Sequence, residues 1–272
     1  MDQNLMLDLL HMHFMHNAML AACMASVVCA IIGTFVVINR IVFVSGGIAH
    51  AAYGGVGLAV YFGFPPLLGI TGFSVLASML MAWVSLKARR RTDTMIGVLW
   101  ALGMALGVIL LDLSPGYNVN LMSFLFGSIM TVPNTDLWLM AGLTLLILGL
   151  VCYYYYDFIA LSFDPEFAQV RGIPVSLLYL VLMLMIGLSV VIVIQVVGLI
   201  LVIALMSISP YIAERFCASP WRMMLVSMGL NLLFTFSGLS LAVLFDISTG
   251  PAIILVASLA FFVGHRKDVY KK

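Results

Sequence analysis

Long apolar stretches alternate with short polar breaks along the whole chain, and charged residues, prolines and turn residues gather in the breaks. Each stretch is close to the roughly 20 residues that a helix needs to cross a bilayer. The pattern predicts nine crossings, at residues 17–38, 44–62, 66–86, 95–113, 136–156, 174–193, 196–213, 221–241 and 249–264. We therefore expect an all-α polytopic membrane protein.

One further apolar stretch, residues 117–131, is short and lies between Ser114-Pro115-Gly116 and Pro133-Asn134. We expect it to form a re-entrant or interfacial helix that does not cross. Composition agrees with a lipid environment, because 64% of the 272 residues are hydrophobic and only 8% are charged, whereas an average soluble domain is about 25% charged. The length leaves room for one transmembrane domain, residues 1–272, and no separate soluble domain.

The basic residues predict the orientation, because Lys and Arg stay in cytoplasmic loops. With the C-terminus inside, all 12 Lys and Arg residues fall in inner loops or in the tail 265–272. The N-terminal segment 1–16 then becomes an external lead-in. No cleavable signal peptide is expected, because the first basic residue is Arg40 and such peptides begin with a positive region.

His50 is the ionisable residue that lies deep within a predicted span, and such residues are expensive in lipid and usually functional. Its neighbours are small, with Gly46, Gly47, Gly54 and Gly55 nearby in the sequence, so the segment has room for an ion. An imidazole is a ligand for zinc, copper, iron and nickel. The alternative is a histidine that only makes a hydrogen bond between helices.

Weaker metal candidates lie outside the spans. His13 and His16 are three residues apart near the N-terminus and can share one helical face, so they are either a loose metal contact or part of a lead-in helix. Asp246 is either a helix cap or a residue near the place where an ion enters. Within the spans, Gln195 and Asn231 favour interhelical hydrogen bonds over ligation.

An inner loop at residues 163–172 has the signals of a short helix. Asp164 is placed to cap it, Pro165 takes the first helical position and Gly172 ends it. Such a helix either transmits force from a partner or is a simple connector. The chain has no P-loop lysine in the Gly-Lys-Ser/Thr setting, so energy has to come from another subunit or from an ion gradient, and no catalytic set argues for an enzyme.

Five ordered motifs resemble those of the permease subunits of zinc, manganese and iron ATP-binding-cassette importers, from Phe14 to about Phe262. They are RIVFVSGGIAHA at 40–51, TDTMIG at 92–97, FG at 126–127, FDPEF at 163–167 with GIP at 172–174, and the stretch from Val197-Gly198 to Pro210. The resemblance implies a transport permease of a bacterial inner membrane, working as a homodimer with two cytoplasmic ATPase subunits and an external metal-binding protein. It also implies a coupling helix that docks on the ATPase, with the residues Phe163, Asp164, Pro165, Glu166, Phe167, Arg171 and Gly172.

The sequence departs from this family at one position. Many relatives read G-D-A-x-S-H-A in the second span, but here Gly46 stands where they have Asp, and only His50 is retained. Losing a carboxylate removes a hard ligand that suits manganese and leaves an imidazole that suits zinc. We therefore expect zinc as the transported ion, bound only in passage, with manganese or iron as alternatives. Competing hypotheses are a permease for a siderophore or corrinoid and a structural or signalling membrane protein.

Overall fold

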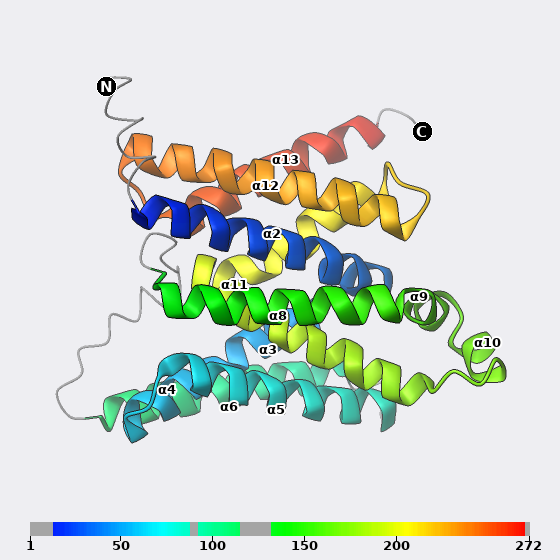
Figure 1. Cartoon of the computed structure of the whole chain (residues 1–272), viewed down its shortest axis with the longest axis horizontal. Coiled ribbons are helices and arrows are strands. Elements are labelled where there is room, and N and C mark those ends of the chain that lie inside the picture. Colours follow the sequence, from blue (N-terminus) through cyan, green and yellow to red (C-terminus); the bar gives the residue numbers. More distant parts are fainter. Residues whose placement is uncertain (1–12, 88–91, 115–131, 270–272) are drawn as a thin grey trace.

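The computed structural model describes residues 13–87, 92–114 and 132–269, and the regular structure in these ranges is helical. The segment 117–131 lies outside the described residues, as do residues 1–12 of the lead-in and 270–272 of the tail. The helices, shown in Figure 1, are α2 (His13–Ile38), α3 (Val42–Ala51), α4 (Tyr53–Phe62), α5 (Pro66–Lys87), α6 (Thr92–Asp112), α8 (Asn134–Tyr153), α9 (Tyr155–Phe163), α10 (Pro165–Val170), α11 (Val175–Glu214), α12 (Pro220–Phe245) and α13 (Thr249–Val269).

The expectation of a polytopic all-α protein is confirmed, but the count of nine crossings is not. Seven helical segments in the described part of the chain are long and apolar enough to cross a bilayer. The stretches predicted at 196–213 and 249–264 form the shorter apolar helices Leu201–Glu214 and Thr249–Gly264. A helix of 14 residues measures only about 21 Å, less than the roughly 30 Å of the hydrocarbon layer.

Helix α11 forms the centre of the bundle and packs against α2, α3, α5, α8, α12 and α13. It is counted as one helix of 40 residues, but Gly198 inside it has φ 76° and ψ 176°. This backbone conformation is open to glycine and not to L side chains, so the chain turns back there. Figure 1 shows the result, since both ends of α11 lie at the end of the bundle that carries α10.

Helices α3 and α4 run nearly as one, because the residue between them, Ala52, keeps right-handed helical angles. They pack against α5, α6 and α11. Gly55 of α4 meets the backbone of Gly69 of α5 so closely that a side chain at either position would collide with the other backbone. Small residues thus allow the close packing of helices that lipid requires.

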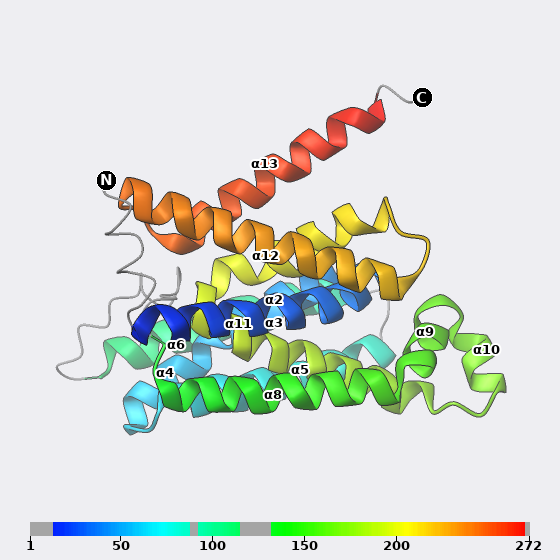
Figure 2. The same ribbon diagram turned by 45° about the horizontal axis from the view of Figure 1, so that its top comes forward.

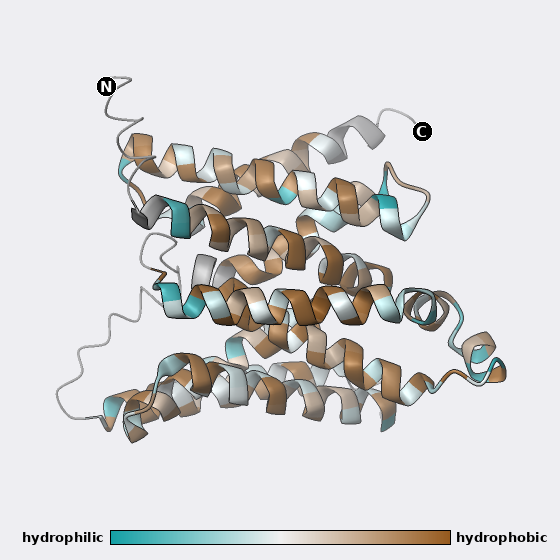
Figure 3. Ribbon diagram, in the orientation of Figure 1, coloured by the Kyte–Doolittle hydropathy of each residue, from teal (hydrophilic) through white to brown (hydrophobic). Residues whose placement is uncertain are grey.

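Polar residues gather toward the two ends of the bundle, and apolar residues cover its length (Figure 3). Inside the bundle, the fully buried Asn231 of α12 accepts a hydrogen bond from Ser209 Oγ of α11 at 2.6 Å and donates one to the Ser26 carbonyl of α2 at 3.4 Å. The expectation of interhelical hydrogen bonding is therefore confirmed for Asn231. The side chain of Gln195 is outside the described part. Helix α13 packs on α12 near its start and then diverges from it (Figure 2).

Candidate functional site

His50 lies in the last turn of α3, among buried small residues, and is itself half-buried. Its imidazole stacks on the indole of Trp100 from α6, with ring centroids 4.0 Å apart and ring planes 8° from parallel. Its Nδ1 atom is buried and has no hydrogen-bond partner within the described residues. His50 is therefore oriented by aromatic stacking, which leaves Nε2 as the nitrogen that is able to meet a ligand.

Gly46 lies one helical turn before His50 and faces α11. A Cβ atom at this position would lie 2.6 Å from Ile203 Cδ1 and 2.9 Å from Ile203 Cγ1. The space that a side chain at position 46 would need is thus filled by an isoleucine. A side chain at position 46 would therefore require the flexible end of the half-buried Ile203 side chain to move.

The other predicted ligands come from the start of α2 and the end of α12. His16 is exposed near the start of α2, and His13 begins that same helix, which continues into the span. Asp246 is exposed and takes the left-handed conformation, φ 51°, directly after α12, so it ends this helix and does not cap the next one. No group of three or more His, Cys, Asp or Glu residues in the described ranges is arranged to hold a metal.

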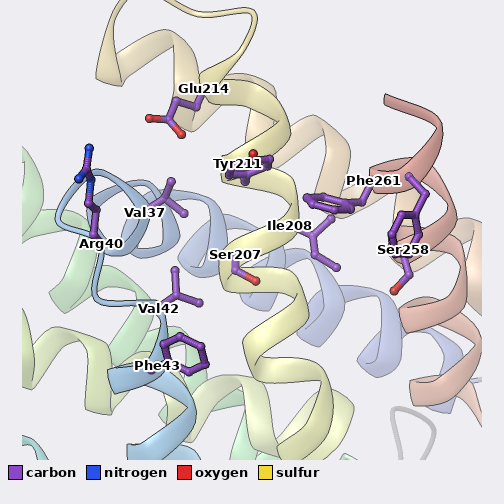
Figure 4. Close-up of a pocket in the computed structure, with 11 residues that line it drawn as sticks. Val37, Arg40, Val42, Phe43, Ser207, Ile208, Tyr211, Glu214, Ser258 and Phe261 are labelled. Carbon is purple, nitrogen blue, oxygen red and sulfur yellow. The ribbon is translucent and has the colours of Figure 1, made fainter. Parts of the chain in front are cut away.

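A cavity of about 800 Å³ opens where α2 ends, α3 begins, and α11 and α13 approach each other. In the close-up of Figure 4, Glu214 lies at the top and Phe43 at the bottom, with Arg40 at the left and Phe261 at the right. Most of the lining is apolar and aromatic, including Tyr211 and Phe261. Phe43 stands two helical turns before His50 on α3, so the cavity adjoins the histidine-bearing helix at the end where the coupling segment lies.

The turn between α2 and α3 is held by main-chain hydrogen bonds from Arg40 N to the Val37 carbonyl and from Ile41 N to the Val36 carbonyl, both 3.0 Å. Arg40 takes the left-handed conformation, φ 57°, at the position that glycine usually fills in such a helix end. Asn39 in the same turn donates to Ser162 Oγ of α9 at 2.8 Å. The turn that leads into the His50 helix is thereby hydrogen-bonded to the helix before the coupling segment.

The expected short helix in the inner loop is present as α10. The Asp164 carboxylate accepts the backbone N–H of Phe167 at 2.9 Å, Pro165 is in the first turn, and Gly172 has φ 78°. Phe163, Phe167 and Val170 are exposed, the last to 88%. Glu166 and Arg171 are also exposed, and the Arg171 guanidinium lies over the Phe167 ring at 5.7 Å. An apolar surface with flanking charges therefore projects from this end of the bundle.

Trp100 belongs to this site but was not identified by the sequence analysis. It is the one aromatic residue of α6, whose other residues are aliphatic, small or polar. An isolated indole within a predicted span was the available signal. Its partner, however, is set by the packing of α3 on α6, which hydropathy does not reveal.

The bundle of apolar helices defines the class as a multi-pass membrane protein. The family profile of the ABC 3 transport family matches residues 11–267. The chain therefore belongs to this family, and the resemblance found in its motifs is confirmed.

Known proteins agree with this assignment over nearly the whole chain. An uncharacterized membrane protein of Synechocystis sp. is 51% identical over 258 residues, covering 95% of this chain and 92% of that protein. The manganese transport system membrane protein MntC of Halalkalibacterium halodurans is 31% identical over 267 residues, covering 96% and 91%. In a solved structure, PsaBC from Streptococcus pneumoniae in complex with Fab, a chain with 27% identity superposes with a TM-score of 0.85 and covers 95% and 93%.

Proposed function

We propose that this chain is the membrane-spanning permease subunit of an ATP-driven importer of a divalent metal ion, with zinc favoured over manganese and iron. The observation that carries the proposal is His50, a half-buried imidazole inside a spanning helix, in a family whose relatives include a named manganese transport protein. Hydrolysis of ATP belongs to a separate subunit.

A second copy of the chain completes the site. The described part of one chain offers His50 without further His, Cys, Asp or Glu residues arranged around a common metal position. Zinc in a protein takes about four ligands, so two symmetry-related His50 imidazoles with water or carbonyl oxygens are a more reasonable set than one. This need supports a homodimer with the ion at the contact between the copies.

The route of the ion follows from the ends of the bundle. With the N-terminus outside and the C-terminus in the cytoplasm of a bacterium, an external metal-binding protein delivers the ion at the end where α2 begins. The cavity lined by Arg40, Phe43 and Glu214 then serves as the vestibule from which the ion leaves, beyond His50. The ATPase docks on the exposed Phe163, Phe167 and Val170 at this same end.

The preference for zinc rests on Gly46. Manganese is a harder ion than zinc and favours carboxylate oxygen, whereas imidazole suits zinc. Position 46 holds no carboxylate, and Ile203 fills the space beside it. Imidazole ligands without a carboxylate beside them therefore favour zinc over manganese.

Uptake by vesicles that contain the permease with its co-purified ATPase tests the proposal. We expect ATP-dependent accumulation of zinc in preference to manganese, and we expect His50→Ala to reduce it to the level of protein-free vesicles. His16→Ala is the matched control, since His16 is exposed at the start of α2 and should transport normally. Full zinc uptake by a folded His50→Ala protein would exclude His50 as the carrier of the ion.

A further inference from the structure

The indole of Trp100 covers one whole face of the His50 ring. Ring centroids 4.0 Å apart with planes 8° from parallel place the two rings in van der Waals contact. The indole comes from a different helix, α6, and is itself half-buried. The His50 ring therefore stacks on an aromatic ring that comes from another helix.

Stacking on Trp100 takes the place of a hydrogen bond to Nδ1 of His50. In most metal-binding histidines, one nitrogen ligates and the other donates a hydrogen bond that fixes the ring. Here Nδ1 is buried and no group in the described ranges accepts or donates a hydrogen bond to it. Rotation of the imidazole is thus limited by stacking on Trp100, where a hydrogen bond would ordinarily limit it.

Close contacts on both sides of the stack keep the two helices in register. A Cβ at Gly47 would lie 2.6 Å from Ile96 Cγ2, one turn before Trp100 on α6. On the other side, Gly103 of α6 approaches the backbone of Ala51 so closely that no side chain would fit there. These contacts prevent α6 from sliding along α3, so the indole stays beneath the imidazole.

We propose that Trp100 is a positioning residue for His50, holding the imidazole plane so that Nε2 faces the transported cation. The proposal rests on the proposed function, in which His50 binds the ion. Metal binding at Nε2 makes the stacked imidazole electron-poor, and the indole emission reports this change directly.

The test uses the full-length chain in lipid nanodiscs with Zn²⁺ as the probe. Three other tryptophans, each more than half exposed, are replaced by Phe so that only Trp100 emits; they are Trp83, Trp138 and Trp221. We expect Zn²⁺ to quench Trp100 emission with the same dissociation constant that radioactive zinc gives for the unaltered chain. Zinc binding without any change in Trp100 emission would overturn the proposal.

Two substitutions distinguish a role of the aromatic ring of Trp100 in stacking from a role in filling space only. Trp100→Leu should weaken zinc binding about 10-fold to 100-fold, the usual effect of losing a group that orients a metal ligand, whereas Trp100→Phe should restore most of the affinity. Equal losses in the two variants, or an unchanged affinity in Trp100→Leu, would refute the role of the ring. His50→Ala distinguishes the two proposals, because unchanged zinc binding in that variant removes His50 as the site, whereas a loss there leaves the Trp100 variants to decide.

Discussion

Gly46→Asp places a carboxylate one turn before His50. The substitution has two opposing effects, because it adds a metal ligand but also a steric clash. A Cβ at this position lies 2.6 Å from Ile203 Cδ1 and 2.9 Å from Cγ1, where carbon atoms in ordinary contact are about 3.5–4.0 Å apart. Overpacking of a dense interior costs about 1–3 kcal/mol, and the cost here falls at the lower end because the colliding atoms belong to the flexible end of a half-buried side chain. We therefore expect Gly46→Asp, more than Gly46→Ala, to lower the apparent melting temperature in detergent.

Removing the Ile203 side chain allows the effect of the carboxylate on ion preference to be measured. Ile203→Ala deletes both of the atoms that collide, so in Gly46→Asp/Ile203→Ala the carboxylate has room beside His50. A hard, charged ligand should then shift the zinc-to-manganese uptake ratio toward manganese, about tenfold for each 1.4 kcal/mol of altered preference. Gly46→Asn/Ile203→Ala is the matched control of similar size without the charge.

The assay is uptake of both ions by vesicles at equal protein content, together with thermal unfolding of each variant. Gly97→Ala is the packing control, because a Cβ at Gly97 of α6 meets nothing within 4 Å. If Gly46→Asp unfolds at the temperature of the parent and of Gly97→Ala, Ile203 does not obstruct a side chain at position 46. If the double variant with Asp keeps the ion preference of the one with Asn, position 46 does not determine selectivity.

Two further predictions concern the link to the ATPase. Phe167→Ala should weaken ATPase binding about 30-fold if this exposed ring is a central contact of about 2 kcal/mol, while Gln169→Ala on the same helix should not; equal binding of both variants would identify α10 as a connector only. Asn39→Ala and Ser162→Ala should each lower the ions transported per ATP hydrolysed, and the double variant should be no worse than the worse single one, because both remove the same hydrogen bond, worth about 1 kcal/mol. Additive losses would show that Asn39 and Ser162 act independently.

Local rules predicted the features that depend on neighbours in the chain. The cap of α10 follows from a carboxylate within reach of an amide three residues later, and its end follows from the conformational freedom of glycine, so Asp164, Pro165 and Gly172 were recognisable from the sequence. Seven spans were recognisable for a similar reason, because hydropathy summed over about 20 residues exceeds the influence of any one neighbour.

Tertiary packing determined the rest. Trp100 and Ile203 reach the His50 segment from helices distant in the sequence, and no periodicity within one helix predicts which residue of another will face it. Asp246 was expected to be either a helix cap or a residue near the place where an ion enters, and its left-handed backbone places it at the end of α12. The predicted spans 174–193 and 196–213 meet at residues 194–195, whereas the non-helical angles are at Gly198.

Because the chain reverses at Gly198, the fit of α11 to the membrane depends on the thickness of the hydrocarbon layer. A straight helix of 40 residues would be about 60 Å long, twice the hydrocarbon layer. The helix after the break, Leu201–Glu214, measures only about 21 Å, so one of its ends lies within the hydrocarbon layer, where its main chain has to be shielded by protein. Gly198 is itself buried. Short-chain lipids should relieve this mismatch and long-chain lipids should increase it, each at a fraction of a kcal/mol per ångström. We therefore expect the rate of transport to depend on the thickness of the host membrane.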